Sequence, residues 1–161
     1  MSSMTSITVA LLLITTAGSS VAAPQSANEI IALERAALDR WGRGDPTGYL
    51  ELYANDVTYF APDTDQRVDG LPAMRGLLLP RTGKIKIDRY EMIEPVVQFH
   101  GDIALLSFNI VNYQRQPDGR EQPIRRWNVT EAYSRIDGRW RIIHSHFSYV
   151  KPELKEPTRV E

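Results

Sequence analysis

Residues 137–148 read Asp137-Gly138-Arg139-Trp140-Arg141-Ile142-Ile143-His144-Ser145-His146-Phe147-Ser148. The Asp-Gly pair favours a tight turn between two strands, because glycine adopts the positive φ that such a turn needs. The aromatic and β-branched residues that follow favour an extended strand. The stretch therefore predicts a turn and the last strand of an antiparallel sheet.

Three more segments of extended character precede this strand. Turn residues separate them at His100-Gly101-Asp102 and at Pro117-Asp118-Gly119, and Pro95 interrupts the first segment. The pattern predicts a meander of long antiparallel strands at 85–99, 103–116, 124–136 and 140–150.

Helical spacing dominates the chain before residue 84. Ser26 and Glu29 have the spacing of a capping box at the start of a long helix. This helix separates apolar from charged residues, and the charged face expected in solvent carries Glu34, Arg35, Asp39 and Arg40. Asp45 and Pro46 begin a second, shorter helix.

A short strand at 57–60 and a brief third helix at 72–79 complete the predicted elements. Because helices come first and a sheet follows, we expect an α+β domain in which the long helix covers one face of a curved sheet. No repeat or linker divides residues 27–152, which we expect to form one domain. Residues 153–161 are expected to form a loose tail.

The composition excludes several classes of function. The 161 residues include 19 Lys and Arg, 20 Asp and Glu and no cysteine, which gives a formal net charge of -1. This balance offers no general attraction for nucleic acid, and the lack of cysteine excludes disulfides and thiolate chemistry. Neither a phosphate-binding glycine loop nor a serine nucleophile motif occurs. We therefore expect no nucleic-acid partner and no cofactor.

The N-terminal segment differs from the rest, because no charged residue precedes Glu29. The apolar run at 7–17 and the small residues after it predict a signal peptide at 1–22, cleaved after Ala22, although no Lys or Arg precedes the run. The alternative is an apolar N-terminus on a cytosolic protein. The run is shorter than the roughly 20 residues that span a bilayer, so we expect a periplasmic or secreted protein without stable membrane insertion.

His144 and His146 lie on one face of the last predicted strand, where two histidines resemble half of a metal site. A zinc site needs a third protein ligand, for which His100 and Glu131 are the candidates. Two histidines on a strand face more often serve packing or hydrogen bonding, so we expect no metal.

Glu131 is the strongest acid–base candidate in the predicted sheet. It shares a strand face with Trp127 and Tyr133, which would remove it from water and raise the pKa of its carboxyl group. The alternative is an ion pair with Arg126, Arg135 or Arg141. Asp56, near Tyr59, is a second candidate, although its position in the chain is equally typical of a turn.

Both alternating sets of residues in the strand at 103–113 are substantially apolar. One layer of helices covers only one face of a sheet, so the other face needs a second cover. We therefore expect a homodimer or a larger closed oligomer formed through the sheet.

The order of these elements resembles the nuclear transport factor 2-like superfamily, a cone-shaped fold with a pocket between sheet and helices. The residues that carry the resemblance are Gly44-Asp45 with Tyr49, Val68-Asp69-Gly70-Leu71, Gly101-Asp102 and above all 137–148. Within the superfamily the chain looks most like the association (hub) domain of calcium/calmodulin-dependent protein kinase II and its stand-alone, SnoaL-like bacterial relatives. Kinase motifs are absent, so no kinase activity is implied.

The resemblance also implies where a ligand would bind. Hub domains carry buried arginines in their pocket, and the corresponding positions here are Asn109, Glu131 and Phe147. This implies a neutral or acidic pocket and a mostly apolar or neutral-polar ligand. The expected lining residues are Trp41, Tyr53, Tyr59, Asn109, Trp127, Tyr133, His146 and Phe147.

Three functions remain open from the sequence. The first is a small-molecule-binding protein that associates with itself. The second is an isomerase, cyclase or hydrolase of the SnoaL or ketosteroid isomerase type, with Glu131 or Asp56 as base and Tyr59, Tyr133 or His146 donating to an oxyanion. The third is a pure oligomerisation module, as in the kinase hub.

Overall fold

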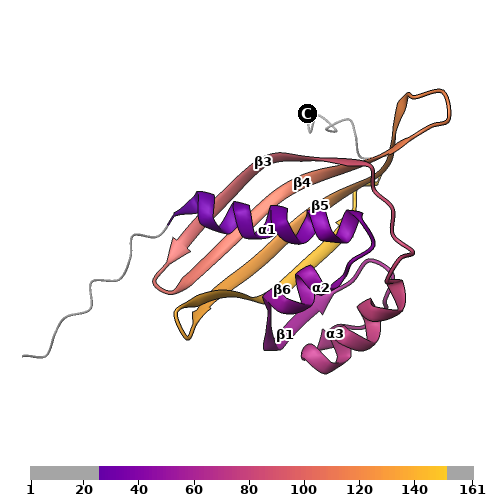
Figure 1. Ribbon diagram of the computed structural model, residues 1–161. Coiled ribbons are helices and arrows are strands. Elements are labelled where there is room, and N and C mark those ends of the chain that lie inside the picture. Colours follow the sequence, from indigo (N-terminus) through magenta and orange to yellow (C-terminus); the bar gives the residue numbers. More distant parts are fainter. Residues whose placement is uncertain (1–25, 152–161) are drawn as a thin grey trace, which may run out of the picture.

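The computed structural model describes residues 26–151, and the expected signal peptide (1–22) and tail (153–161) lie outside them. Three α-helices lie on one side of a six-stranded sheet (Figure 1). The helices are α1 (Ala27–Gly42), α2 (Thr47–Leu52) and α3 (Leu71–Leu78), the last continued by a 3-10 turn at Leu79–Arg81. The strands are β1 (Tyr53–Phe60), β2 (Val68–Asp69), β3 (Arg89–His100), β4 (Ile103–Arg115), β5 (Glu121–Ile136) and β6 (Arg139–Tyr149).

The sheet has the strand order β2-β1-β6-β5-β4-β3. Strands β3 to β6 form the expected antiparallel meander, which confirms the α+β fold class. Two features were not expected. Strand β1 begins at Tyr53 rather than at 57 and pairs in parallel with β6, and the short β2 adds an edge beside it.

The interruption predicted at Pro95 is present as a β-bulge in β3. The register between β3 and β4 shifts between Ile93 and Val96, and Glu94 has a φ of 45°. Proline has no N–H to continue the ladder, and a bulge increases the local twist of a strand. The bulge therefore lies in the edge strand β3, which runs beside α1 (Figure 1).

Helix α1 begins where the sequence predicted, but the expected capping box does not form. The Ser26 side chain makes no capping bond, although its carbonyl accepts from the Glu29 amide at 3.1 Å. The Glu29 carboxylate instead accepts from the Trp140 indole N–H at 3.3 Å. The acidic side chain that would complete the box is therefore used to bond the helix to β6.

The helices cover one face of the sheet, called here the inner face, and leave the outer face bare (Figure 1). On β4 the inner face carries Ala104, Leu106, Phe108 and Ile110, all at most 6% exposed. Full burial of one such aliphatic or aromatic side chain stabilises the fold by roughly 1.5–3 kcal/mol. The alternating inner residues of β4, β5 and β6 thus form the core against α1.

The corner between α1 and α2 fixes a loop that is needed below. Arg40 bridges the corner by donating to Asp45 and to Glu51, both at 2.7 Å. Gly44 has a φ of +81°, and its carbonyl accepts from the Gly83 amide at 2.9 Å. A Cβ at Gly44 would lie 3.0 Å from the Gly83 Cα, so only glycine allows this approach. The contact holds residues 84–87 beside the end of α1.

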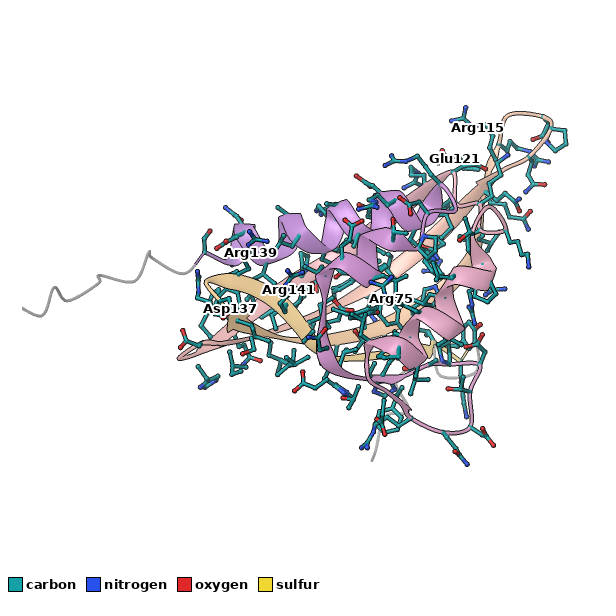
Figure 2. The ribbon with its side chains drawn as sticks, turned by 60° about the horizontal axis from the view of Figure 1, so that its bottom comes forward. Arg75, Arg115, Glu121, Asp137, Arg139 and Arg141 are labelled. Carbon is teal, nitrogen blue, oxygen red and sulfur yellow. The ribbon has the colours of Figure 1, made fainter. Side chains whose placement is uncertain are left out.

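Charged side chains mark both ends of the sheet (Figure 2). Arg115 and Glu121 lie at the β4–β5 hairpin, 3.8 Å apart, and Asp137, Arg139 and Arg141 lie at the opposite end. Between 26 and 151, no helix has the length and apolar character needed to cross a membrane.

Candidate functional site

A cavity of about 270 Å³ lies between the inner face of the sheet and the helices. Its walls come from the end of α1, from α2, β1 and α3, and from residues 84–87. The sheet contributes the ends of β4, β5 and β6 that lie toward the β4–β5 hairpin, called here the hairpin-side ends. The aromatic lining residues are Trp41, Tyr49, Tyr53, Tyr59, Trp127, Phe147 and Tyr149. Pockets for small molecules are typically apolar and aromatic with a few polar groups, and this lining fits that description.

The aromatic rings of the wall pack against one another. Trp127 stacks on Tyr149 with ring centroids 4.3 Å apart, and it meets Phe147 edge-on at 6.4 Å. On the opposite wall, Tyr49 contacts Trp41 at 6.2 Å and Tyr53 at 5.9 Å. Such contacts limit ring motion, so the cavity is largely preformed.

Five of the eight expected lining residues border the cavity, namely Trp41, Tyr53, Tyr59, Trp127 and Phe147. Asn109 and His146 do not, because both lie on the outer face. Asn109 pairs with Asn128 across β4 and β5, and His146 pairs with Phe60 across β6 and β1. Tyr133 is on the inner face but is 0% exposed in the core and does not reach the cavity.

Asn112 is the polar lining residue that sequence reasoning missed. It lies on the inner face, two residues beyond Ile110, and is 7% exposed. Its Oδ1 atom has no hydrogen-bond partner, the one such buried side-chain atom in the described part of the chain. Strand alternation from Leu106 onward predicts this inward position, but the sequence does not show that a cavity opens there.

Basic side chains gather around the cavity, in contrast to the neutral or acidic pocket that the resemblance implied. Arg81, Lys84, Lys86 and Arg125 all line it, with Asp63 the one acidic lining residue. Arg81 pairs with Asp63 at 2.5 Å, whereas within residues 26–151 no carboxylate pairs with Lys84 or Arg125. None of these cations stands at Asn109, Glu131 or Phe147, the three positions from which the resemblance implied a neutral or acidic pocket.

Two carboxyl groups lie buried behind the cavity. Glu34 of α1 and Glu131 of β5 are both 0% exposed. The Tyr133 hydroxyl lies 2.8 Å from Glu34 Oε2 and 3.0 Å from Glu131 Oε2. Tyr49 donates to Glu34 Oε1 at 2.6 Å, and Ser145 donates to Glu131 Oε1 at 2.7 Å.

This arrangement differs from two sequence-based expectations. Glu34 was expected in solvent, yet it points from α1 into the core, where hydroxyl groups satisfy it. The sequence also left open an ion pair between Glu131 and a neighbouring arginine, but no arginine of the described region pairs with Glu131. Helical spacing alone does not predict that Glu34 points inward, because this orientation depends on a polar partner on the sheet.

Burial raises the pKa of the Glu131 carboxyl well above its ordinary value of 4.5, and the nearby Glu34 raises it further. Hydrogen-bond counting also requires one additional proton on the pair. The Tyr133 hydroxyl has one proton, which cannot serve two carboxylates at once. A protonated Glu131 can donate to the Tyr133 oxygen while Tyr133 donates to Glu34, so the pair holds one proton and one negative charge.

Tyrosines separate the carboxyl pair from the cavity. Neither Glu34 nor Glu131 lines it, whereas Tyr49 and Tyr53 do. Burial raises the pKa of the Tyr53 phenol well above its ordinary value. Burial likewise raises the pKa of Tyr59. Neutral phenols therefore line the inner end, and the carboxyls do not contact a ligand directly.

The remaining sequence candidates lie apart from the cavity. Asp56 is exposed on β1 and does not line it. His144 and His146 are on the outer face, where His144 Nδ1 lies 2.7 Å from the Thr58 hydroxyl, and Glu131 is on the inner face. Burial lowers the pKa of His144. Within the described residues, no three potential metal ligands come together.

A curved, unclosed sheet with helices on its inner face and a cavity at one end defines the nuclear transport factor 2-like class of proteins. The family model of the SnoaL-like domain matches residues 30–152. The chain belongs to this SnoaL-like family.

Solved structures agree with this assignment. A Parabacteroides distasonis protein, provisionally named as a ketosteroid isomerase, is 34% identical over 84% of this chain and 96% of its own, with a TM-score of 0.70. The association domain of CaMKII from C. elegans is 22% identical over 75% and 93% of the two chains, with a TM-score of 0.64. The CaMKII hub homology domain of the alga Chlamydomonas reinhardtii is 23% identical over 80% and 100%, with a TM-score of 0.65. No curated protein matches the chain significantly in sequence.

Proposed function

We propose that the protein binds a small molecule in the cavity between α1, α3 and the hairpin-side ends of β4, β5 and β6. The observation that carries the proposal is Asn112, whose Oδ1 atom is buried and unpartnered at a cavity with aromatic walls. A buried polar atom without a partner costs about 1–3 kcal/mol, which a ligand with a hydrogen-bond donor would recover. The volume suits a ligand about the size of a few fused rings or smaller.

The proposal is tested by filling the cavity. Leu77 lines it, so Leu77→Trp should occupy part of the space, whereas Leu79→Trp adds the same side chain at an exposed position outside it. A library of small aromatic compounds is screened for an increase in Tm, because a ligand of the folded state stabilises it. We expect the hits to act on the unmodified protein and on Leu79→Trp, but not on Leu77→Trp. Equal shifts in all three proteins would show binding elsewhere.

Proton-transfer catalysis is the second candidate, and the buried carboxyl pair is the observation that favours it. The 34% identical relative is named provisionally as a ketosteroid isomerase. However, Tyr49 and Tyr53 stand between the pair and the cavity, so any proton must pass through a phenol. We expect the unmodified protein to isomerise a β,γ-unsaturated ketosteroid no faster than the Glu131→Gln variant does. A rate that falls at least tenfold in this variant would instead establish catalysis.

Self-association through the outer face belongs to the proposal. No element of the described chain covers this face, and Phe60, Val96 and Ile103 expose 45%, 53% and 38% of their surface there. A second copy of the chain would cover them, as the hub and association domains among the structural relatives suggest. Sedimentation should give a dimer or larger closed oligomer that Val96→Lys weakens and Leu79→Lys does not. A mass of six or more subunits would favour the pure oligomerisation module.

Export to the periplasm or exterior is the last part of the proposal. It rests on the sequence of residues 1–22 alone. Expression of the full chain in a bacterial host, followed by fractionation and N-terminal sequencing, should recover a periplasmic protein that begins at Ala23. A cytosolic product that keeps residue 1 or 2 would refute export.

A further inference from the structure

Four side chains on the inner face form a block of two cross-strand pairs beside the cavity. Ile110 of β4 lies opposite Trp127 of β5, and Asn112 lies opposite Arg125. Side chains that are directly opposite in an antiparallel pair point to the same face, with Cβ atoms about 4.5–5.5 Å apart. All four residues line the cavity. The cavity floor is therefore apolar on its inner half and polar on its outer half.

The polar half offers one acceptor and one cation side by side. The Asn112 Oδ1 atom is buried and lacks a donor. The Arg125 guanidinium lies 5.9 Å from the centroids of the Trp127 and Tyr149 rings and donates to the Tyr149 hydroxyl at 3.3 Å. No carboxylate of the described chain pairs with it. Lys84, also without an acidic partner in that region, adds a second positive charge to the lining.

From this juxtaposition we propose that the ligand is an aromatic acid with a hydrogen-bond donor next to its anionic group. The inference rests on the proposed function and names its ligand class. The ring lies over Ile110 and Trp127, the donor bonds to Asn112, and the anion faces Arg125. The planar guanidinium fork suits a carboxylate better than a neutral group.

Three small compounds separate these interactions. Mandelate has a ring, a hydroxyl and a carboxylate, phenylacetate lacks the hydroxyl, and mandelamide lacks the charge. Binding to the full chain is followed by NMR at the indole N–H groups of the three tryptophans. Trp41 and Trp127 line the cavity, whereas Trp140 lies outside it and serves as an internal reference. We expect mandelate to bind about 2- to 10-fold more tightly than phenylacetate and about 2- to 5-fold more tightly than mandelamide.

Two variants assign each preference to its residue. Asn112→Leu keeps the side-chain volume and should abolish the advantage of mandelate over phenylacetate. Arg125→Gln should abolish the advantage of mandelate over mandelamide. The matched control for the charge is Arg126→Gln, because Arg126 is adjacent in the chain but lies opposite Val111 on the outer face. This control should leave both preferences unchanged.

The possible failures are distinguishable. If Trp41 and Trp127 shift with mandelamide and with neutral indole but mandelate binds no more tightly, the acid is excluded while the cavity remains a binding site. If preferences persist in both variants, the ligand contacts other residues and the inference is wrong. If no aromatic compound shifts Trp41 or Trp127, the proposed function itself fails.

Discussion

Replacing Glu131 by Gln tests whether the buried pair holds a proton. Glutamine has nearly the shape of a protonated glutamate, with one acceptor oxygen and one donor group. In this site the amide oxygen can accept from Ser145, and the amide N–H₂ can donate to the Tyr133 oxygen, which lies 3.0 Å from Glu131 Oε2. The variant should therefore keep the hydrogen-bond chain and lose only the ability to ionise.

The sign of the pH dependence follows from the raised pKa of Glu131. The folded chain keeps this proton at pH values at which the unfolded chain, with a pKa near 4.5, has lost it. The folded state then binds more protons, so its stability falls as pH rises from about 4.5 to the folded pKa. One retained proton corresponds to about 1.4 kcal/mol per pH unit. Glu131→Gln removes this pH dependence. The free energy of unfolding of the variant should therefore rise relative to that of the unmodified protein by up to about 1.4 kcal/mol per pH unit.

The assay is the Tm of both proteins measured between pH 5 and 8. For a domain of this size, about 1 kcal/mol corresponds to roughly 4 °C, so the two curves should separate by up to about 6 °C per pH unit. Asp56→Asn, which removes an exposed carboxylate, controls for net charge. Parallel curves for Glu131→Gln and the unmodified protein would refute the shared proton. Glu34→Gln should be destabilising, because both Glu34 oxygens face hydroxyl donors and an amide N–H₂ would meet one of them.

Three further variants test the packing around the site. Gly44→Ala should lower the free energy of unfolding by at least about 1–2 kcal/mol, because φ is +81° and Gly83 is close; Gly119→Ala, also at positive φ but with open space around it, should cost less. Leu106→Ala, at 0% exposure, should cost about 2–5 kcal/mol in urea unfolding, and an effect below about 1 kcal/mol would contradict the assigned core. Asn112→Leu should raise stability by about 1 kcal/mol in the absence of ligand, and a loss would mean that its amide is already satisfied.

Local patterns predicted most of the fold. The four meander strands follow from alternation and from turn residues such as Gly101 and Gly138, which both adopt positive φ. The pairing of β1 with β6 could not be predicted in this way, because it joins segments about 85 residues apart and depends on the packing of α1 and α2. The early start of β1 at Tyr53 has the same cause, since its inner-face side chain pairs with Ile142.

The cavity was predicted only in part, for a related reason. Aromatic residues on predicted helices and strands identified five lining positions, but the face of β4 and β6 that points inward depends on where α1 lies. Asn109 and His146 were assigned to the wrong face for this reason. Lys86 was expected in a strand at 85–99, but β3 begins only at Arg89, and residues 84–87 instead border the cavity without forming a strand. The sequence therefore did not place the charges of Lys84 and Lys86 there.

The two polar clusters of the inner face have different physical roles. Glu34 and Glu131 are fully satisfied by Tyr49, Tyr133 and Ser145, so their hydrogen bonds connect α1 and α2 with β5 and β6 and leave nothing for a ligand. The Asn112 Oδ1 atom is buried without a donor in the described chain, so a ligand that donates to it would recover the cost. Arg125 is exposed and has no carboxylate partner there, so its charge is available to an anionic ligand. A completed network of this kind specifies the packing of a core, whereas an incomplete one at a cavity is typical of a recognition site. This contrast favours ligand binding over carboxyl catalysis as the function of the domain.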